Sequence, residues 1–126
     1  MKRLPVVTAK APAAVGPYSQ GVEAGALVFV SGQIPLDAKG QPVAGGVAEQ
    51  TDQCLKNVRE ILLEAGLTMD SVVKVTVFMT DLGQFAAMNE VYAKHFAYPY
   101  PARAAVQAAA LPKGAAVEIE AIALRP

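Results

Sequence analysis

The fold is decided by residues 47–80, VAEQTDQCLKNVREILLEAGLTMDSVVKVTVFMT, where one hydrophobic period gives way to another. Up to Ala65, apolar residues recur every three or four positions, which is the period of an α-helix that buries one face. Gly66 favours the left-handed conformation that ends a helix. From Val72 to Thr80 apolar and polar residues alternate, as in a half-buried strand. The pattern therefore predicts a helix and then a strand. The predicted buried stripe of the helix is Thr51, Cys54, Leu55, Val58, Ile61, Leu62 and Ala65.

The segments on either side add further strands and a second helix, with proline and glycine marking their ends. The predicted strands are Val6–Ala9, two short strands within Val22–Ser31 that fold about Ala24-Gly25, Ala102–Ala109 and Ala116–Leu124, and the second helix is Gly83–Ala97. Because a strand separates the helices, the pattern indicates an α+β fold, with one sheet of about six strands and both helices on one face. The other face would be bare in a monomer, so we expect an oligomer.

The composition indicates a folded domain with an unusually small amount of charge. The chain has 126 residues, enough for a single domain spanning 1–126, and no linker or repeat divides it. It is 53% hydrophobic and 17% charged, and 11 basic residues balance 11 acidic ones. This balance argues against a disordered chain and against a free-standing nucleic-acid clamp, which would need a basic excess. Such a domain is expected to cover part of its surface with copies of itself.

Cysteine and histidine usage limits the cofactors and the compartment. The single cysteine, Cys54, excludes an intramolecular disulfide, and with His95 as the one histidine we expect no metal site of these ligands. No stretch matches a phosphate or dinucleotide loop, so we expect no cofactor. The purest apolar run, Ala24–Val30, is too short to span a membrane, and no apolar leader follows the first basic residues. We therefore expect a cytoplasmic protein without a membrane partner.

The last two predicted strands carry charges where charges are costly unless paired or solvated. Arg103 lies mid-strand among alanines, and Glu118 and Glu120 lie among valine and isoleucine. One interpretation is a solvated face or a structural ion pair between subunits. The other is a small-molecule site, in which the arginine fork binds a carboxylate and a glutamate orients or deprotonates water. A simple hairpin would set Arg103 nearer Leu124 than Glu118, so the sequence leaves open whether Arg103 and Glu118 meet within one chain or across two.

Four weaker candidates have structural interpretations. His95 has no carboxylate or nucleophile at a telling spacing, and Cys54 falls on the apolar stripe of the first helix. The segment GPYSQG, residues 16–21, predicts a tight loop because it matches no phosphate-binding spacing. Ser31-Gly32 could place a hydroxyl and an amide at a pocket, but the same pair is common in turns.

Five blocks, in order from about Lys10 to Arg125, are characteristic in combination. They are APAAVGPYSQG (11–21), SGQIP (31–35), VFMTDL (77–82), the stretch from PAR (101–103) to LP (111–112), and EIEA (118–121). The most specific part is Pro-Ala-Arg followed by Glu-Ile-Glu after the Leu-Pro turn. Together the blocks resemble the RidA (YjgF-type) family of reactive-intermediate deaminases, over nearly the whole chain.

The resemblance implies a chorismate-mutase-like fold and a homotrimer with three sites in clefts between subunits. It implies hydrolysis of enamines and imines such as 2-aminoacrylate, released by pyridoxal-phosphate dehydratases acting on serine and threonine, to 2-oxo acids and ammonia. By position, Arg103 would hold the substrate carboxylate and Glu118 would activate water. The other pocket residues would be Tyr18, Ser31, Gly32 and Asn89. The imine carbon is already electrophilic, so positioning and one base suffice, without a metal or covalent nucleophile.

One departure and two alternatives accompany this hypothesis. Many family members carry cysteine two residues after the arginine, where this chain has Ala105, so a thiol contact or redox regulation is in doubt. A binding or chaperone-like trimer that senses 2-oxo acids would need Arg103 alone, and retention of Glu118 favours the enzyme. Some relatives are described as endoribonucleases or translation inhibitors. Zero net charge and a single histidine argue against this function here, because it needs phosphate binding and acid–base cleavage. We expect the trimer interface to cover the face that bears Arg103 and Glu118.

Overall fold

The computed structural model describes residues 2–126, which form one six-stranded sheet and two α-helices. The strands are β1 (Arg3–Val6), β2 (Gly21–Ala24), β3 (Leu27–Gln33), β4 (Val72–Met79), β5 (Ala102–Gln107) and β6 (Val117–Leu124). The helices are α1 (Val47–Glu64) and α2 (Phe85–Tyr92), and short 3₁₀ turns cover Met69–Ser71, Leu82–Gln84 and Pro112–Gly114. Within residues 2–126, neither helix is long and apolar enough to cross a membrane.

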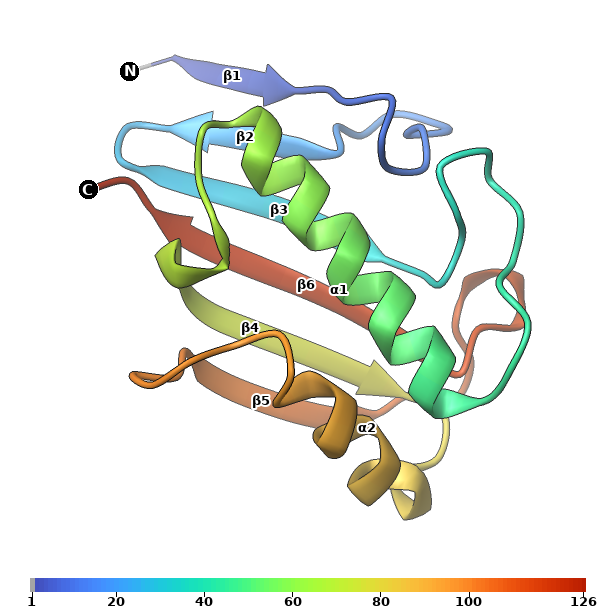
Figure 1. The fold of residues 1–126 in the computed structure, drawn as a ribbon. Coiled ribbons are helices and arrows are strands. Elements are labelled where there is room, and N and C mark those ends of the chain that lie inside the picture. The colour runs from blue at the N-terminus through green and yellow to red at the C-terminus, as the bar shows by residue number, and fades with distance from the viewer. Residues whose placement is uncertain (1) are drawn as a thin grey trace.

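The sheet brings distant parts of the chain side by side, in the order β1-β2-β3-β6-β4-β5 (Figure 1). Neighbouring strands are antiparallel except β4 and β5, which are parallel. A parallel pair needs a crossover connection, and α2 lies in the connection between β4 and β5. The simple hairpin considered from the sequence is therefore absent, because β4 lies between β5 and β6.

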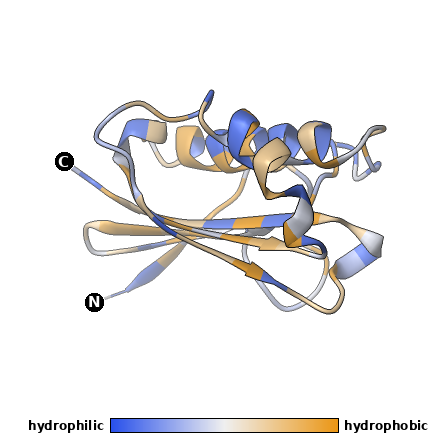
Figure 2. Cartoon of the chain, turned by 90° about the horizontal axis from the view of Figure 1, so that it is seen from below, coloured by the Kyte–Doolittle hydropathy of each residue, from blue (hydrophilic) through white to orange (hydrophobic). Residues whose placement is uncertain are grey.

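Both helices cover the same face of the sheet, as the sequence predicts (Figure 2). α1 packs across β6 and β3, and α2 packs beside α1. The core between the two layers consists mainly of valine, leucine, isoleucine, alanine and methionine. The opposite face carries no helix among the described residues (Figure 2). Four large apolar side chains on it are each more than a third exposed: Leu27, Phe29, Val106 and Leu124.

α1 buries the stripe that its hydrophobic period predicts. All seven predicted residues are buried, and Cys54 Sγ lies 3.6 Å from the carbonyl oxygen of Val117. The period does not reveal Asn57, which is also fully buried. Its amide nitrogen donates hydrogen bonds to the carbonyl oxygens of Leu36 and Ile34, at 2.9 and 3.3 Å. These bonds compensate the burial of the amide and fix the chain after β3 against α1.

The first strand lies earlier than predicted. β1 is Arg3–Val6 rather than Val6–Ala9, because a side chain rather than a neighbouring strand binds the backbone at Thr8. The Thr8 N–H donates to Gln20 Oε1 at 2.7 Å, and Gln20 Nε2 donates to the Thr8 carbonyl oxygen at 3.0 Å. The buried Gln20 amide therefore replaces the strand ladder at this position.

The second helix is shorter than predicted, with α2 spanning Phe85–Tyr92 rather than Gly83–Ala97. Beyond α2, the N–H groups of Lys94 and His95 bond to carbonyl oxygens three residues earlier, so the chain leaves α-helical geometry. Tyr98 and Tyr100 each precede a proline, which disfavours helical geometry for the preceding residue. The chain between α2 and β5 is consequently an irregular connection of turns and bends.

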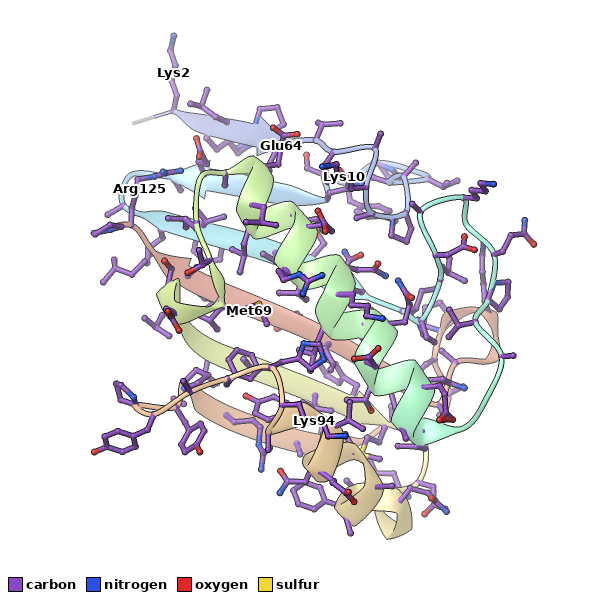
Figure 3. The ribbon with its side chains drawn as sticks, viewed as in Figure 1. Lys2, Lys10, Glu64, Met69, Lys94 and Arg125 are labelled. Carbon is purple, nitrogen blue, oxygen red and sulfur yellow. The ribbon has the colours of Figure 1, made fainter. Side chains whose placement is uncertain are left out.

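The end of β6 is tied to the helix layer through Arg125. This residue follows the last residue of β6, and its side chain lies close to the hairpin of β2 and β3 (Figure 3). Its guanidinium bonds to the Glu23 carboxylate and donates a hydrogen bond to the carbonyl oxygen of Ala65 at 2.8 Å. Arg125 thus joins β2, β6 and the end of α1.

Candidate active site

A β-bulge in β3 places Ser31 and Gly32 beside a carboxylate of β6. The ladder between β3 and β6 shifts register between Val30 and Gln33, which leaves one extra residue on β3. A Cβ added to Gly32 would overlap the Glu118 carboxylate oxygen and would lie 3.0 Å from Glu118 Cδ. Glycine at this position therefore allows the Glu118 carboxylate to rest against the β3 backbone.

The loop before β2, which includes the predicted tight loop at residues 16–21, lies over the bulge. Ser31 Oγ donates to the Ser19 carbonyl oxygen at 2.6 Å, and the Ser31 N–H donates to the Gln20 carbonyl oxygen at 2.9 Å. Gln20 Nε2 also donates to the Pro12 carbonyl oxygen at 2.8 Å. These bonds fix the segment that carries Tyr18, whose side chain remains half exposed.

A cavity of about 790 Å³ opens between this loop, the chain after β3, and β6. That volume lies within the range of small-molecule sites in proteins. Four of the predicted site residues line it: Tyr18, Ser31, Gly32 and Glu118. Its wall also includes Pro12, Ala13, Val15, Gln20, Gln33, Ile34, Leu36, Ala38, Lys39, Gly40, Pro112, Lys113 and Glu120. The wall is therefore mostly apolar, with a small number of charged groups.

Glu118 is the half-buried carboxylate of this cavity. Burial raises the pKa of Glu118 above the usual value for a glutamate, and repulsion from the Glu120 carboxylate raises it further. A carboxylate with a raised pKa is a stronger base than an exposed one. The cavity therefore presents a group that can accept a proton from a bound water molecule.

Arg103 lies outside this cavity, at the edge of the sheet formed by β5. Its Nη1 donates a hydrogen bond to Asn89 Oδ1 at 2.7 Å. Its Cζ lies 4.7 Å from the ring centroid of Tyr92 and 5.3 Å from that of Phe85. All three contacts come from α2. Asn89, predicted as a pocket residue, therefore holds Arg103 and does not line the cavity.

Arg103 and Glu118 lie on opposite faces of the sheet. Arg103 pairs in register with Val75, a fully buried residue of the face beneath the helices. Glu118 pairs with Phe78, three positions further along β4, and successive strand residues alternate between faces. The expectation that one face bears both groups is therefore wrong, because β5 extends the sheet beyond β4 instead of pairing with β6. Within one chain, Arg103 and Glu118 therefore do not share a site.

Comparison with known proteins identifies the family. The family model described as Endoribonuclease L-PSP matches residues 8–125 of this chain. RidA from the Antarctic bacterium Psychrobacter sp. is 47% identical with a TM-score of 0.92, covering 96% of this chain and 98% of that one. The chain belongs to the RidA (YjgF-type) family.

Two further RidA relatives extend this result. The human protein named 2-iminobutanoate/2-iminopropanoate deaminase is 51% identical over 95% of this chain and 88% of its own length. TdcF of E. coli, solved with bound serine, is 46% identical with a TM-score of 0.91, covering 98% of this chain and 99% of that one. The family resemblance and the α+β fold expected from the sequence are thus confirmed.

The aromatic contacts of Arg103 were not predicted from the RidA sequence. The hydrophobic pattern assigns Phe85 and Tyr92 to an apolar stripe of the second helix, together with Met88 and Phe96. Phe85, Asn89 and Tyr92 are spaced at i, i+4 and i+7, which places them on one helix face. Aromatic and amide groups at this spacing are the signal that could have indicated a partner for an arginine.

The structural interpretations of His95 and Cys54 are confirmed, whereas Ser31 and Gly32 lie in β3 and line the cavity rather than forming a turn. His95 Nε2 lies 2.8 Å from Asp52 Oδ1, and the same carboxylate pairs with Lys56 at 2.9 Å, so His95 links the end of α2 to α1. Cys54 is fully buried, and burial raises the pKa of its thiol well above the usual range. Within residues 2–126, no group of three or more His, Cys, Asp and Glu side chains is placed to hold a metal ion.

Proposed function

We propose that this RidA chain, acting as a single domain, hydrolyses reactive 2-enamine and 2-imine acids, such as 2-aminoacrylate and 2-iminopropanoate, to 2-oxo acids and ammonia. The observation that carries the proposal is the division of the site into two halves. One half is a cavity with a carboxylate of raised pKa, Glu118. The other is an exposed arginine, Arg103, held at the sheet edge. Identities of 51–53% to proteins named 2-iminobutanoate/2-iminopropanoate deaminase support the same reaction.

The two halves are joined in our proposal by assembly of the chain into a homotrimer. The β5 edge of one copy would lie against the bare sheet face of the next, so that Arg103 of one copy faces Glu118 of its neighbour. This contact joins two different surfaces, so its repetition gives a ring where the rotation between copies closes, and it does not give a two-fold dimer. A ring of three, as the family resemblance implies, would contain three equivalent sites in clefts between subunits.

The bare face supports an interface because of its apolar side chains. Phe29 and Leu124 are 40% and 47% exposed, and Leu27 and Val106 add to the same face. Completing the burial of such side chains contributes roughly 25 cal/mol for each Å² of apolar surface removed from water. Since the chain has little charge to keep this face in water, burial against another copy is the favourable arrangement.

Arg103 supplies the binding half of the proposed mechanism. Its guanidinium can present two parallel N–H donors to the substrate carboxylate, and this geometry matches a carboxylate better than an ammonium does. Holding the carboxylate at one end of the cleft would set the C2 carbon of the imine at a fixed distance from Glu118. A 2-enamine acid would enter the same path after protonation at C3, which converts it to the imine.

Glu118 supplies the chemical half. It would accept a proton from water as the water oxygen bonds to C2 and the C=N π electrons pass to nitrogen. The tetrahedral intermediate would then form C=O, break its C–N bond and release ammonia, with the proton returned through Glu118. The Ser31 hydroxyl already donates its proton to the Ser19 carbonyl oxygen, so it meets the ligand as an acceptor, which suits a substrate N–H.

The test of the reaction is a coupled assay. A pyridoxal-phosphate dehydratase acting on serine or threonine generates the enamine, and release of the 2-oxo acid is timed with and without this protein. The wild type should accelerate release, and Glu118→Gln should not. Glu64→Gln, which removes an exposed carboxylate at the end of α1 (Figure 3), is the matched control. Binding of 2-oxobutanoate without acceleration of release would favour a binding module instead.

The test of the assembly uses mixed trimers. Arg103→Ala and Glu118→Gln chains, each with a different affinity tag, are co-expressed and purified through both tags. If Arg103 and Glu118 come from neighbouring copies, each mixed trimer contains one intact site and should show about a third of wild-type activity, although each parent is inactive. Inactive mixed trimers would show that the site does not combine these two residues across copies.

We also propose a cytoplasmic location for this RidA protein. The support is its single, fully buried cysteine, since exported domains of this size commonly depend on disulfides. Fluorescence microscopy and fractionation of the tagged protein would test it.

A further inference from the structure

One face of α2 contacts the guanidinium of Arg103. Phe85, Asn89 and Tyr92 occupy this face, and each of them contacts the arginine. The distances from Arg103 Cζ to the two ring centroids are 4.7 Å for Tyr92 and 5.3 Å for Phe85. Each distance lies within the ~6 Å over which a guanidinium is attracted to the face of an aromatic ring. The guanidinium therefore contacts both rings and the Asn89 amide oxygen at once.

The three contacts restrict the guanidinium in complementary ways. Contact with two rings limits movement of the guanidinium, and cation–π attraction favours this position. The hydrogen bond from Nη1 to Asn89 Oδ1, at 2.7 Å, limits rotation within the plane. The remaining N–H groups are left for another partner, because a guanidinium has five donors.

Tyr92 is the more buried of the two aromatic residues. It is 6% exposed, whereas Phe85 is partly buried, and the Tyr92 ring packs at a tilt of 36° against that of Phe96, with centroids 4.7 Å apart. Its hydroxyl is buried and finds no hydrogen-bond partner within residues 2–126. A buried phenol without a partner costs stability, whereas a phenylalanine ring would avoid that cost. The ring, not the hydroxyl, is therefore what this position uses.

Aromatic contacts are suited to an arginine that binds a carboxylic acid, because they do not neutralise its charge. Among residues 2–126, Arg103 forms no ion pair with a carboxylate. A carboxylate beside Arg103 would occupy the same N–H donors and would neutralise the charge that attracts the substrate. Two rings and an amide oxygen fix the guanidinium while leaving its positive charge unneutralised.

We propose that Phe85 and Tyr92 are positioning residues, which hold the Arg103 guanidinium in the orientation that binds the substrate carboxylate. The proposal rests on the deaminase function proposed above. The two residues act through Arg103 and touch neither the imine nor the water. Loss of either ring would leave the arginine charged but mobile, so substrate binding is weakened while the chemical step at Glu118 continues.

The experiment compares Tyr92→Leu with the conservative variant Tyr92→Phe in the dehydratase-coupled assay. We expect Tyr92→Leu to raise KM about tenfold with kcat changed less than twofold; tenfold corresponds to ~1.4 kcal/mol, within the range of a cation–π contact. Tyr92→Phe should restore the KM, because the ring is retained. Glu90→Ala, which changes an exposed residue of α2, is the control for effects on the helix itself.

A double-mutant cycle separates positioning from general damage to the helix. In an Arg103→Ala background no cation is left for the ring to hold, so adding Tyr92→Leu should lower kcat/KM no further. A merely structural role for Tyr92 would lower kcat/KM by the same factor in both backgrounds. Additive losses, or an unchanged KM in a folded Tyr92→Leu protein, would overturn the proposal.

An NMR measurement tests the contact between Arg103 and Tyr92 independently of activity. In ¹⁵N-labelled protein, the Arg103 Nε–H proton should be shifted upfield by the neighbouring rings, and Tyr92→Leu should remove much of this shift. If the wild type hydrolyses imines but the shift and KM are insensitive to Tyr92→Leu, the positioning role is wrong and the deaminase function stands. If the wild type shows no hydrolysis, the proposed deaminase function is wrong. The positioning role of Phe85 and Tyr92 in that reaction is then wrong as well, even if the upfield shift is observed.

Discussion

Replacing Gly32 by alanine should separate the chemistry of the proposed site from its binding. The added Cβ would overlap the Glu118 carboxylate oxygen and would lie 3.0 Å from Glu118 Cδ. Ordinary contacts between carbon atoms are ~3.5–4.0 Å, so the carboxylate must move by roughly 1 Å. The moving group is the end of a flexible side chain, so we expect the protein to remain folded. A misplacement of ~1 Å costs about a hundredfold in rate, which should appear in kcat.

The assay is dehydratase-coupled release of the 2-oxo acid, with kcat and KM determined separately. KM should change little, because Arg103 and its contacts on α2 are untouched. Gly46→Ala is the matched control, since Gly46 has a negative φ of −97° and no atom within 4 Å of an added Cβ. Near-normal kcat in a folded Gly32→Ala protein would refute the assignment of Glu118 as the base.

Three further outcomes are expected. Arg103→Ala should lower kcat/KM about a hundredfold or more, since it removes two charge-assisted hydrogen bonds of ~1.5–3 kcal/mol each. Arg103→Lys should also have a low kcat/KM. Both values are determined from initial rates, in variant proteins whose mass in solution equals that of the wild type. Burial raises the pKa of Glu118, so the folded state keeps this proton to higher pH than the unfolded state, and stability falls as pH rises through the interval between the two pKa values. In urea unfolding, Glu118→Gln should therefore have a higher free energy of unfolding than wild type at pH 7, and this difference should be absent at pH 4. An equal difference at both pH values would contradict the burial of this carboxylate. Imine hydrolysis should survive treatment with a chelator, and loss of activity that added metal restores would contradict the mechanism.

Local pattern was sufficient for the buried face of α1. The spacing of apolar residues in α1 indicated the buried stripe without reference to any other segment, because a helix selects its inward face through its own period. The same reasoning indicated that Arg103 and Glu118 are unusual, since a charge within an apolar strand needs a partner or solvent. It did not reveal Asn57 or Gln20, because their hydrogen bonds go to segments that the helix or strand period does not describe.

The sequence by itself determined the order of helices and strands, the family resemblance and the residues capable of chemistry, although the bounds of β1 and α2 differ from those predicted. Tertiary structure alone decided how those residues are distributed in space. β5 pairs in parallel with β4 and stays separate from β6, so Arg103 lies beneath the helices with Asn89 and Glu118 lies on the opposite face beside Gly32. Strand order and register arise from contacts between distant segments, and a shift of one residue or an exchange of neighbours moves a side chain to the other face without altering the local pattern.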